Sequence, residues 1–377
     1  MRGRILFNGN MADPVLFAQR IRPFLFEAAR PGHAPRVTLV TAAWGAGEYN
    51  EGGIKAAFNA VGVASPQVDG YDRGIQNLCV WHVWQAFLAR RPDVAAVTRD
   101  LAAVEEATRH FYLETTAFHA ERVRRAARAA RQQIPGFRLG QVAQQPRDPV
   151  RPDALLTGQE LLQRAMSREL QRAIDALVDN DQAMLETLAE AEALVHARTG
   201  LRHDPEWQRL KAGLEERILG SDVLVFLGGD PSSLLAPFQF FELRSALLEA
   251  LRRGALVCAI SAGALFLCER MIIYDNYNPH PERREFRLHD RGMGLVGGLQ
   301  IMPHCMDRIH TDDPDNLAYL ARRFSTHICA GLNEESFLLV DLAGPTATSV
   351  GNHDGVYVFG PAGLKLCYRA GEGIPLG

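Results

Sequence analysis

Cysteine is scarce in this chain, and no two cysteines have metal-binding spacing. The six cysteines lie at positions 79, 258, 268, 305, 329 and 367, without a C-x-x-C pair. The sequence therefore predicts neither a zinc site nor a disulfide framework. A long apolar run is also lacking near the N-terminus, because Asn8 and Asn10 interrupt the stretch that starts at Ile5. We expect no signal peptide and no membrane span, and residence in the cytoplasm.

An excess of charge of one sign is absent as well. The 377 residues carry a formal net charge of −3, and 47% of them are hydrophobic. This composition argues against a disordered tail and against a nucleic-acid-binding protein, which needs a basic surface. It predicts a globular protein with a large core and with neither nucleic acid nor membrane as a partner.

The chain divides into three blocks that differ in their pattern of expected strands and helices. Residues 1–81 and 204–377 alternate short apolar strands with helices, whereas residues 82–203 show almost no strand signal. The expected strands lie at 5–7, 37–40, 223–226, 255–260, 336–341 and 356–359, and the expected helices near 14–29, 51–61 and 238–252. Such alternation predicts an α/β fold in which both outer blocks share one doubly wound, mostly parallel sheet.

The middle block, residues 82–203, reads as two long helices. Apolar residues recur at steps of four and three along two stripes, with Asp181 as the one charged position of the second. The stripes are Val97, Leu101, Val104, Phe111, Phe118 and then Leu170, Ile174, Leu177, Met184, Leu188, Ala191, Val195. Four prolines between 134 and 152 and a capping box at 157–160 mark a turn. We expect an inserted antiparallel helical hairpin. Its two stripes could cover each other within one chain or be covered by a second copy, so the hairpin could be a homodimer interface or a lid over the site.

Ser261 is the first candidate for catalysis. It lies between the apolar run 255–258 and the helix-like run 265–267, with small residues on both sides. A serine on a sharp strand-to-helix turn has an exposed hydroxyl, as in the G-x-S-x-G elbow, whose first glycine is here Ala259. The alternative is a packing turn of small residues.

Two further motifs could complete a site around this serine. Gly228 and Gly229 end a buried strand, so main-chain N–H groups of this loop could approach a substrate closely. With the N–H of Ala262 they could form an oxyanion hole, in which a donor contributes about 3 to 4 kcal/mol. His304 follows a short apolar strand and Pro303 and is a candidate base. The alternatives are a plain turn and a structural histidine.

These motifs, taken in order, resemble dipeptidase E and cyanophycinase, which are serine peptidases on a class I glutamine amidotransferase-like, flavodoxin-like fold. The resemblance is carried by residues 221–230, 253–264 and 299–304. Residues 331–334 and 350–359 resemble the late Gly-x-x-Glu segment and the closing hairpin of the family. The resemblance covers about residues 1–80 and 204–370 and does not include the helical hairpin.

The resemblance implies a role for each matching residue. Ser261 would be the nucleophile, and His304 the general base and then the general acid. Gly229 and Ala262 would be the oxyanion donors, while Gly228 and Asp230 of the same loop would contact the substrate. The family carboxylate that orients the histidine lies about fifteen residues after the serine. This spacing points to Asp275, with Asn276 at the ungapped match, and Asp290 or Glu269 as substitutes.

The leading hypothesis is a serine hydrolase that cleaves a peptide or isopeptide bond of a small peptide substrate through an acyl-enzyme, without metal or organic cofactor. A preference for a bond next to an acidic residue is implied by the resemblance alone. The competing hypothesis is a catalytically silent, amidotransferase-like binding or partner protein that acts through its helical insertion. An α/β-hydrolase esterase ranks last, because it needs more sheet between serine and histidine. A glutaminase is disfavoured, because amidotransferases of this fold have cysteine at the elbow.

Overall fold

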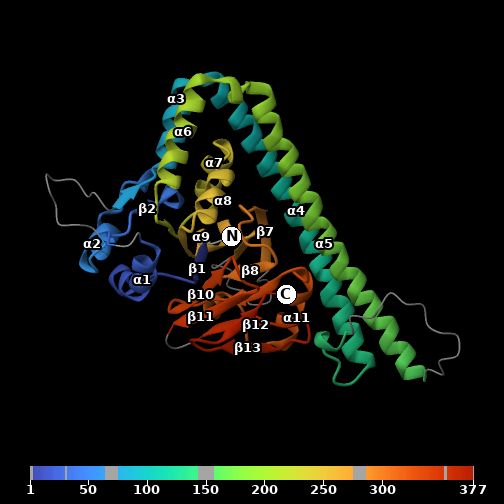
Figure 1. Cartoon of the computed structure of the whole chain (residues 1–377). Helices are drawn as coiled ribbons and strands as arrows, with labels where there is room; N and C mark the ends of the chain where they lie inside the picture. The colour runs from blue at the N-terminus through green and yellow to red at the C-terminus, as the bar shows by residue number, and fades with distance from the viewer. Residues whose placement is uncertain are drawn as a thin grey trace.

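An eight-stranded sheet lies at the centre of the α/β part of the chain (Figure 1). The computed structural model describes residues 3–29, 32–63, 75–142, 157–274, 286–351 and 355–376. The strands are β1 (Arg4–Asn8), β2 (Val37–Val40), β3 (Ile75–Asn77), β4 (Val223–Phe226), β5 (Leu256–Ile260), β10 (Ser336–Asp341), β11 (Thr346–Gly351) and β14 (Gly373–Pro375). Their order is β14-β11-β10-β1-β5-β4-β2-β3. The strands β1, β5, β4, β2 and β3 are parallel, and β10, β11 and β14 pair antiparallel. The predicted α/β fold with a mostly parallel sheet is confirmed.

Alternate side chains of the central strands pack on opposite faces of this sheet. Val223 and Val225 of β4 join a core with α1 (Pro14–Ala28) and α2 (Gly52–Ala60). Leu224 and Phe226 join the other core, which includes α6 (Pro205–Leu219), α7 (Pro231–Phe240) and α8 (Arg244–Arg252). Because both faces are buried, β4 and β5 appear in the sequence as uninterrupted apolar runs. The sheet is doubly wound.

The single helix expected near 238–252 is two helices. α7 ends at Phe240 and α8 begins at Arg244. Between them Glu242 has a φ of 51°, in the left-handed region that cannot continue a right-handed helix. The Glu242 carboxylate is held by Arg202 and Lys211, so local ion pairs accompany the break.

Two smaller sheets follow in the chain. One has four strands in the order β13-β12-β9-β8, and the other pairs β6 with β7. Their bounds are β6 (Arg270–Tyr274), β7 (Phe286–Arg291), β8 (Leu299–Met302), β9 (Ile328–Gly331), β12 (Val356–Phe359) and β13 (Lys365–Tyr368).

The closing hairpin expected over 350–359 is wrong. β11 pairs with β10 and β14, whereas β12 pairs with β9 and β13 in the other sheet. Gly351 and Gly355, on either side of the step between the sheets, have φ values of 140° and 67°. A Cβ at Gly355 would lie 2.4 Å from the Tyr368 carbonyl oxygen. These glycines redirect the chain from one sheet to the other.

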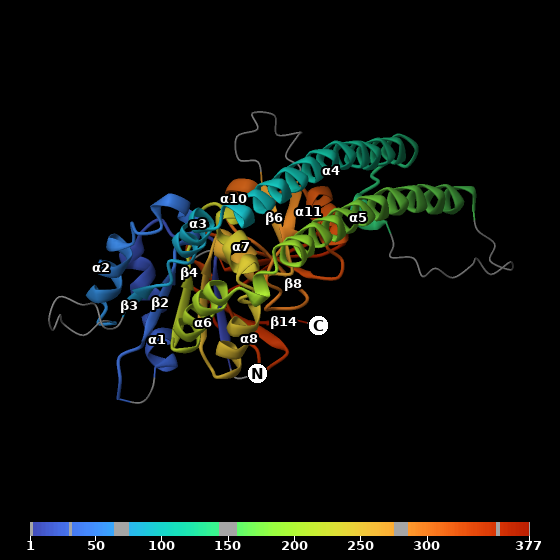
Figure 2. The same cartoon turned by 90° about the horizontal axis from the view of Figure 1, so that it is seen from above.

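Two helices of 42 residues each, α4 (Pro92–Gln133) and α5 (Gly158–Thr199), run side by side along one flank of the α/β part (Figure 1, Figure 2). α3 (Val80–Arg90) leads into α4. α5 opens with the expected capping box, in which Thr157 and Glu160 bond reciprocally. The remaining helices are η1 (Ala42–Gly47), η2 (Leu139–Gln141), η3 (Leu201–His203), α9 (Ala262–Leu267), α10 (Cys305–Arg308) and α11 (Pro314–Arg323). Within the described ranges, no helix is both long and apolar enough to cross a bilayer.

The two predicted stripes have different environments. The second stripe, on α5, is buried along its whole length. On α4, Val97 and Leu101 pack against the main core, but Val104, Phe111 and Phe118 are 49%, 71% and 68% exposed. α4 turns another face inward, formed by Tyr112, Thr116, Ala120, Val123, Ala127 and Ala130. Much of the first stripe is therefore exposed and lies outside the core.

A buried ion pair joins the long helices to α11. Arg323 of α11 donates to both carboxylate oxygens of Asp181 on α5, at 2.9 and 2.7 Å. The Tyr112 hydroxyl of α4 donates to the same carboxylate at 2.6 Å and accepts from Arg323 at 3.0 Å. The side chains of Asp181 and Arg323 are fully buried. The charged position in the α5 stripe is thus paired within the core, as a buried charge requires.

Candidate active site

Ser261 lies on a strained turn between β5 and α9. Its φ and ψ are 51° and −111°, a backbone conformation that residues other than glycine rarely adopt. Neighbouring bonds hold it there: the Ser261 N–H donates to the Asn8 carbonyl at 3.1 Å, and the Ser261 carbonyl accepts from the Ala264 and Leu265 N–H groups. A Cβ at Gly263 would lie 2.5 Å from the Phe226 carbonyl oxygen, so this turn requires a residue without a side chain there. The geometry is that of a nucleophile elbow.

His304 faces this serine. Its Nε2 atom lies 2.8 Å from Ser261 Oγ, and both residues are half-buried. His304 follows β8 and also has a positive φ, 51°. The chain beyond it is fixed, because the Cys305 N–H donates to the Leu332 carbonyl and the Met306 N–H to the Asn333 side chain. Ser261 and His304, which are distant in sequence, thus lie in contact, and each has a strained backbone conformation that neighbouring hydrogen bonds hold in place.

The pKa of His304 is lowered from its ordinary value to about 4. Burial is the main cause, the positive charge of Arg308 adds to it, and Asp307 opposes it. The imidazole is therefore neutral at pH 7 and can accept a proton. With the Ser261 hydroxyl donating to Nε2, the ring proton resides on Nδ1, which is the atom that an orienting carboxylate would contact.

Asp275 and Asn276 lie outside the described residues, directly after the last residue of β6. The two alternatives for the orienting carboxylate have other partners. Asp290 accepts a hydrogen bond from Arg109 at 2.9 Å, and Glu269 bonds His327 at 2.9 Å. Neither alternative carboxylate is hydrogen-bonded to His304.

The glycine loop after β4 lies against the serine. A Cβ at Gly228 would be 3.0 Å from Ser261 Cβ, and one at Gly229 would be 2.5 Å from the Ala43 carbonyl oxygen. Gly229 has a φ of 143°, and the Gly228 carbonyl accepts from the Trp44 indole at 2.9 Å. Glycine is therefore required at position 229 by close approach and by backbone conformation, and at position 228 a side chain would crowd Ser261.

The other two residues expected near the substrate lie at helix starts. Ala262 is the first residue of α9 and is buried. Asp230 caps α7, accepting hydrogen bonds from the Ser233 N–H at 2.8 Å and from its hydroxyl at 2.6 Å. The Asp230 carboxylate thus has a structural partner on its own helix, which the sequence reading did not anticipate.

The sequence reading missed contacts between the inserted helix and the loop region. Arg109 of α4 donates to the His289 carbonyl on β7 at 3.2 Å. His289 Nε2 lies 3.0 Å from the Ser232 hydroxyl, in the first turn of α7. Burial lowers the pKa of His289 to about 4, so this histidine is neutral at pH 7. No local pattern in the sequence marked Arg109 as a residue that contacts β7.

The model of peptidase family S51 matches residues 180–348. This stretch begins inside α5, ends inside β11, and includes the glycine loop, Ser261 and His304. Over these residues, which make up less than half of the chain, the chain is similar to peptidase family S51. It is a serine-type peptidase, and the resemblance to dipeptidase E and cyanophycinase is confirmed. α4 lies outside the S51 match.

Among solved structures, the crystal structure of a peptidase from an acI-B1 Actinobacterium is similar to this chain. The two are 13% identical, the alignment covers 100% of this chain and 97% of the other, and the TM-score is 0.46. A search of curated proteins finds no match.

Proposed function

We propose that this peptidase hydrolyses a peptide or isopeptide bond through an acyl-enzyme on Ser261, with His304 as general base and then general acid. The observation that carries the proposal is the 2.8 Å approach of Ser261 Oγ to His304 Nε2 on a strained elbow. A serine hydroxyl becomes an effective nucleophile only when a base accepts its proton.

In the proposed first step, Ser261 Oγ attacks the carbonyl carbon and its proton moves to His304 Nε2. The N–H groups of Gly229 and Ala262 stabilise the oxyanion, each by about 3 to 4 kcal/mol. The C–N bond then breaks and His304 returns the proton to the leaving amine. In the second half, water loses a proton to His304 and attacks the acyl carbon. The C–O bond to Ser261 then breaks, His304 returns the proton to Ser261 Oγ, and the acid is released.

We propose Asp275 as the carboxylate that orients His304. Its support is its position directly after β6 and the spacing from the serine in the family that the chain resembles. Replacing such a carboxylate by an amide leaves the histidine in the wrong tautomer and lowers kcat by up to about 10⁴-fold. Asp275→Asn should therefore be nearly inactive, whereas Asp290→Asn should retain the kcat of the unaltered chain to within a few-fold.

The proposed substrate is a small peptide with an acidic residue next to the scissile bond, contacted by the loop of Gly228 and Asp230. The resemblance alone supports the acidic preference. A matched panel of Asp-Xaa and Asn-Xaa peptides tests it directly. A ratio of kcat/KM values near one would remove the acidic preference and leave the peptidase assignment in place.

We further propose a cytoplasmic homodimer that uses the exposed stripe of α4. Val104, Phe111 and Phe118 repeat every seven residues along one exposed face. A partner helix can cover such a stripe, and a two-fold axis would place it against itself. Cytoplasmic residence is supported by the six cysteines, which form no disulfide in the part of the chain that the structure describes.

Labelling with a serine-directed fluorophosphonate tests the catalytic proposal. The unaltered chain should gain one phosphonyl adduct with loss of fluoride, and Ser261→Ala and His304→Ala should gain none. Ser325→Ala, at an exposed serine outside the site, is the matched control and should label fully. Absence of an adduct from the unaltered chain would favour the silent partner protein that acts through its insertion.

A further inference from the structure

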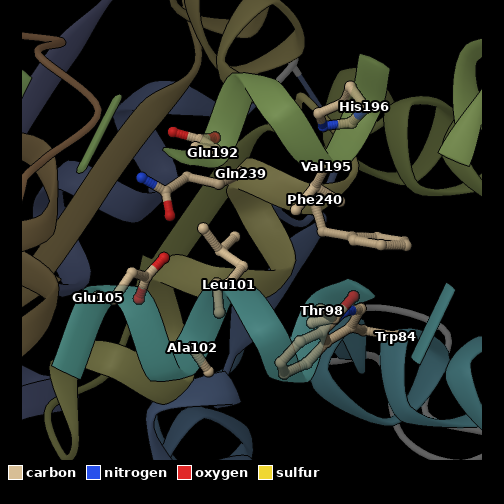
Figure 3. Close-up of a pocket in the computed structure, with 11 residues that line it drawn as sticks. Trp84, Thr98, Leu101, Ala102, Glu105, Glu192, Val195, His196, Gln239 and Phe240 are labelled. Carbon is tan, nitrogen blue, oxygen red and sulfur yellow. The ribbon is translucent and has the colours of Figure 1, made fainter. Parts of the chain in front are cut away.

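A cavity of about 110 Å³ lies at the base of the helical insertion, where α3, α4, α5 and α7 meet (Figure 3). It contains none of the residues proposed for catalysis. Its lining residues are Trp84, Thr98, Leu101, Ala102, Glu105, Glu192, Val195, His196, Ala236, Gln239 and Phe240. Polar and aromatic side chains occupy opposite ends, with aliphatic side chains between them (Figure 3). Such a cavity with a few convergent polar groups is the usual form of a small-molecule site.

The polar end carries more negative than positive charge. Glu105 and Asp290 share the single guanidinium of Arg109, at 3.2 and 2.9 Å. Glu192 forms no ion pair and accepts no side-chain hydrogen bond within the described ranges. Burial, followed by the charges of Asp290 and Glu105, raises the pKa of Glu192 to about 7. Arg291 opposes this rise, so two cations, Arg109 and Arg291, lie near this end against the three carboxyl groups of Glu105, Glu192 and Asp290.

The aromatic end contains hydrogen-bonding atoms without a partner. Trp84 Nε1 and His196 Nδ1 are both buried, and neither has a partner in the part of the chain that the structure describes. Both side chains lie near Phe240 at the end away from Glu105 and Glu192 (Figure 3). A buried donor or acceptor left unpaired costs about 1 to 3 kcal/mol. An occupant with an oxygen atom at this end could form a hydrogen bond with one of these two atoms.

We propose that this cavity binds a small primary ammonium compound with a short aliphatic chain and a terminal oxygen. The ammonium group lies between Glu105 and Glu192, the methylene chain lies against Leu101 and Val195, and the oxygen bonds Trp84 or His196. The volume limits the length, since an engineered cavity of about 150 Å³ holds a benzene molecule. A chain of about four carbons fits, and a nucleotide or peptide does not.

Calorimetric titration of the full chain at fixed ionic strength tests the proposal, with 4-amino-1-butanol as the probe. This amine should bind saturably with one site per chain. n-Butylammonium, which keeps the charge but lacks the oxygen, should bind several-fold more weakly. 1-Butanol, which lacks the charge, should bind at least ten-fold more weakly. Absence of saturable heat with either amine would overturn the proposal and leave water as the occupant.

Paired variants separate the cavity from general charge effects. Glu192→Gln should weaken binding of 4-amino-1-butanol at least ten-fold, whereas Glu190→Gln, at an exposed position on the same helix, should not change it. Ala102→Phe should block the cavity, and the neighbouring exposed Ala103→Phe should not. Equal weakening by both members of either pair would refute the site. Because the readout is binding, the result is independent of whether Ser261 is catalytic.

Discussion

Breaking the buried ion pair between Asp181 and Arg323 should destabilise the protein far more than breaking a surface pair. Asp181→Asn keeps the shape of the side chain but removes the charge that two Arg323 hydrogen bonds and one Tyr112 hydrogen bond now satisfy. Arg323 then stays fully buried without a counter-charge. Leaving one member of a buried pair uncompensated costs about 3 to 5 kcal/mol.

Urea unfolding followed by circular dichroism measures this loss of free energy. The matched control is Glu169→Gln, which removes an exposed pair with Arg172 on the same helix, where the nitrogen and oxygen lie 2.6 Å apart. Exposed pairs contribute about 0 to 1 kcal/mol, so the control should change little. If Asp181→Asn costs no more than the control, Arg323 is not held in a low-dielectric site and the account of the buried pair is wrong.

The double variant Asp181→Leu with Arg323→Met distinguishes a lost charge from lost packing. Apolar replacement of both members of a buried pair is often neutral or stabilising. The double variant should therefore be more stable than Asp181→Asn, even though it removes every hydrogen bond of the pair. A double variant less stable than either single one would show that the hydrogen bonds, and not the uncompensated charge, dominate.

Three further predictions concern the site and the exposed stripe. His304 must be neutral to act as a base, so kcat/KM should fall as the pH drops through its lowered pKa of about 4. Arg308→Gln removes a charge that lowers this pKa, so the acidic limb of the pH profile of kcat/KM should move to higher pH. Arg308→Lys keeps the charge and should leave the limb in place. If the limb does not move in Arg308→Gln either, it does not report the titration of His304. Gly229→Ala should lower kcat at least 100-fold with little change in KM, because a Cβ there would meet the Ala43 carbonyl and displace the proposed oxyanion donor; steady-state kinetics with activity close to normal would exclude that role. Phe111→Glu combined with Phe118→Glu should convert a dimer to a monomer in light scattering, and a monomer already in the unaltered chain would refute the interface.

The strained turn at Ser261 could be predicted because its signal is local. Ser261 sits between a buried strand and a helix, with Gly263 where the Phe226 carbonyl leaves no room for a side chain. Such a turn depends on a few neighbouring residues, so the pattern of small residues is sufficient to find it. The approach of His304 is not local, and only the order of motifs shared with a known family indicated it.

The inward face of α4 could not be predicted, because large apolar residues outweigh small ones in a periodicity. Val104, Phe111 and Phe118 define the strongest stripe, yet they are exposed. The buried face instead contains Ala120, Ala127 and similar small residues. Small side chains let two long helices approach closely, but they contribute little to a hydrophobic pattern.

The prediction of a closing hairpin over 350–359 was wrong for a different reason than the prediction of the buried face of α4. Its two segments do form β11 and β12, and the error lies in their pairing. A short connection normally favours a hairpin. β11 pairs with β10, which directly precedes it, and β12 pairs with β13, which directly follows it. On its second side each strand pairs with a strand that is not its neighbour in sequence, β14 for β11 and β9 for β12. The sequence of residues 350–359 alone does not indicate pairing with such distant strands.

The proposed inserted unit, residues 82–203, shares its contacts with the site and is not a separate appendage. Arg109 holds β7 through the His289 carbonyl and Asp290, and Tyr112 accepts from the Leu288 N–H of the same strand at 3.3 Å. β7 reaches the first turn of α7 through His289 and Ser232, just beyond the glycine loop. Because the buried pair of Asp181 fixes the same helices to α11, α4 cannot shift without disturbing β7. The insertion therefore supports β7, which contacts the start of α7 directly after the glycine loop that lies against Ser261.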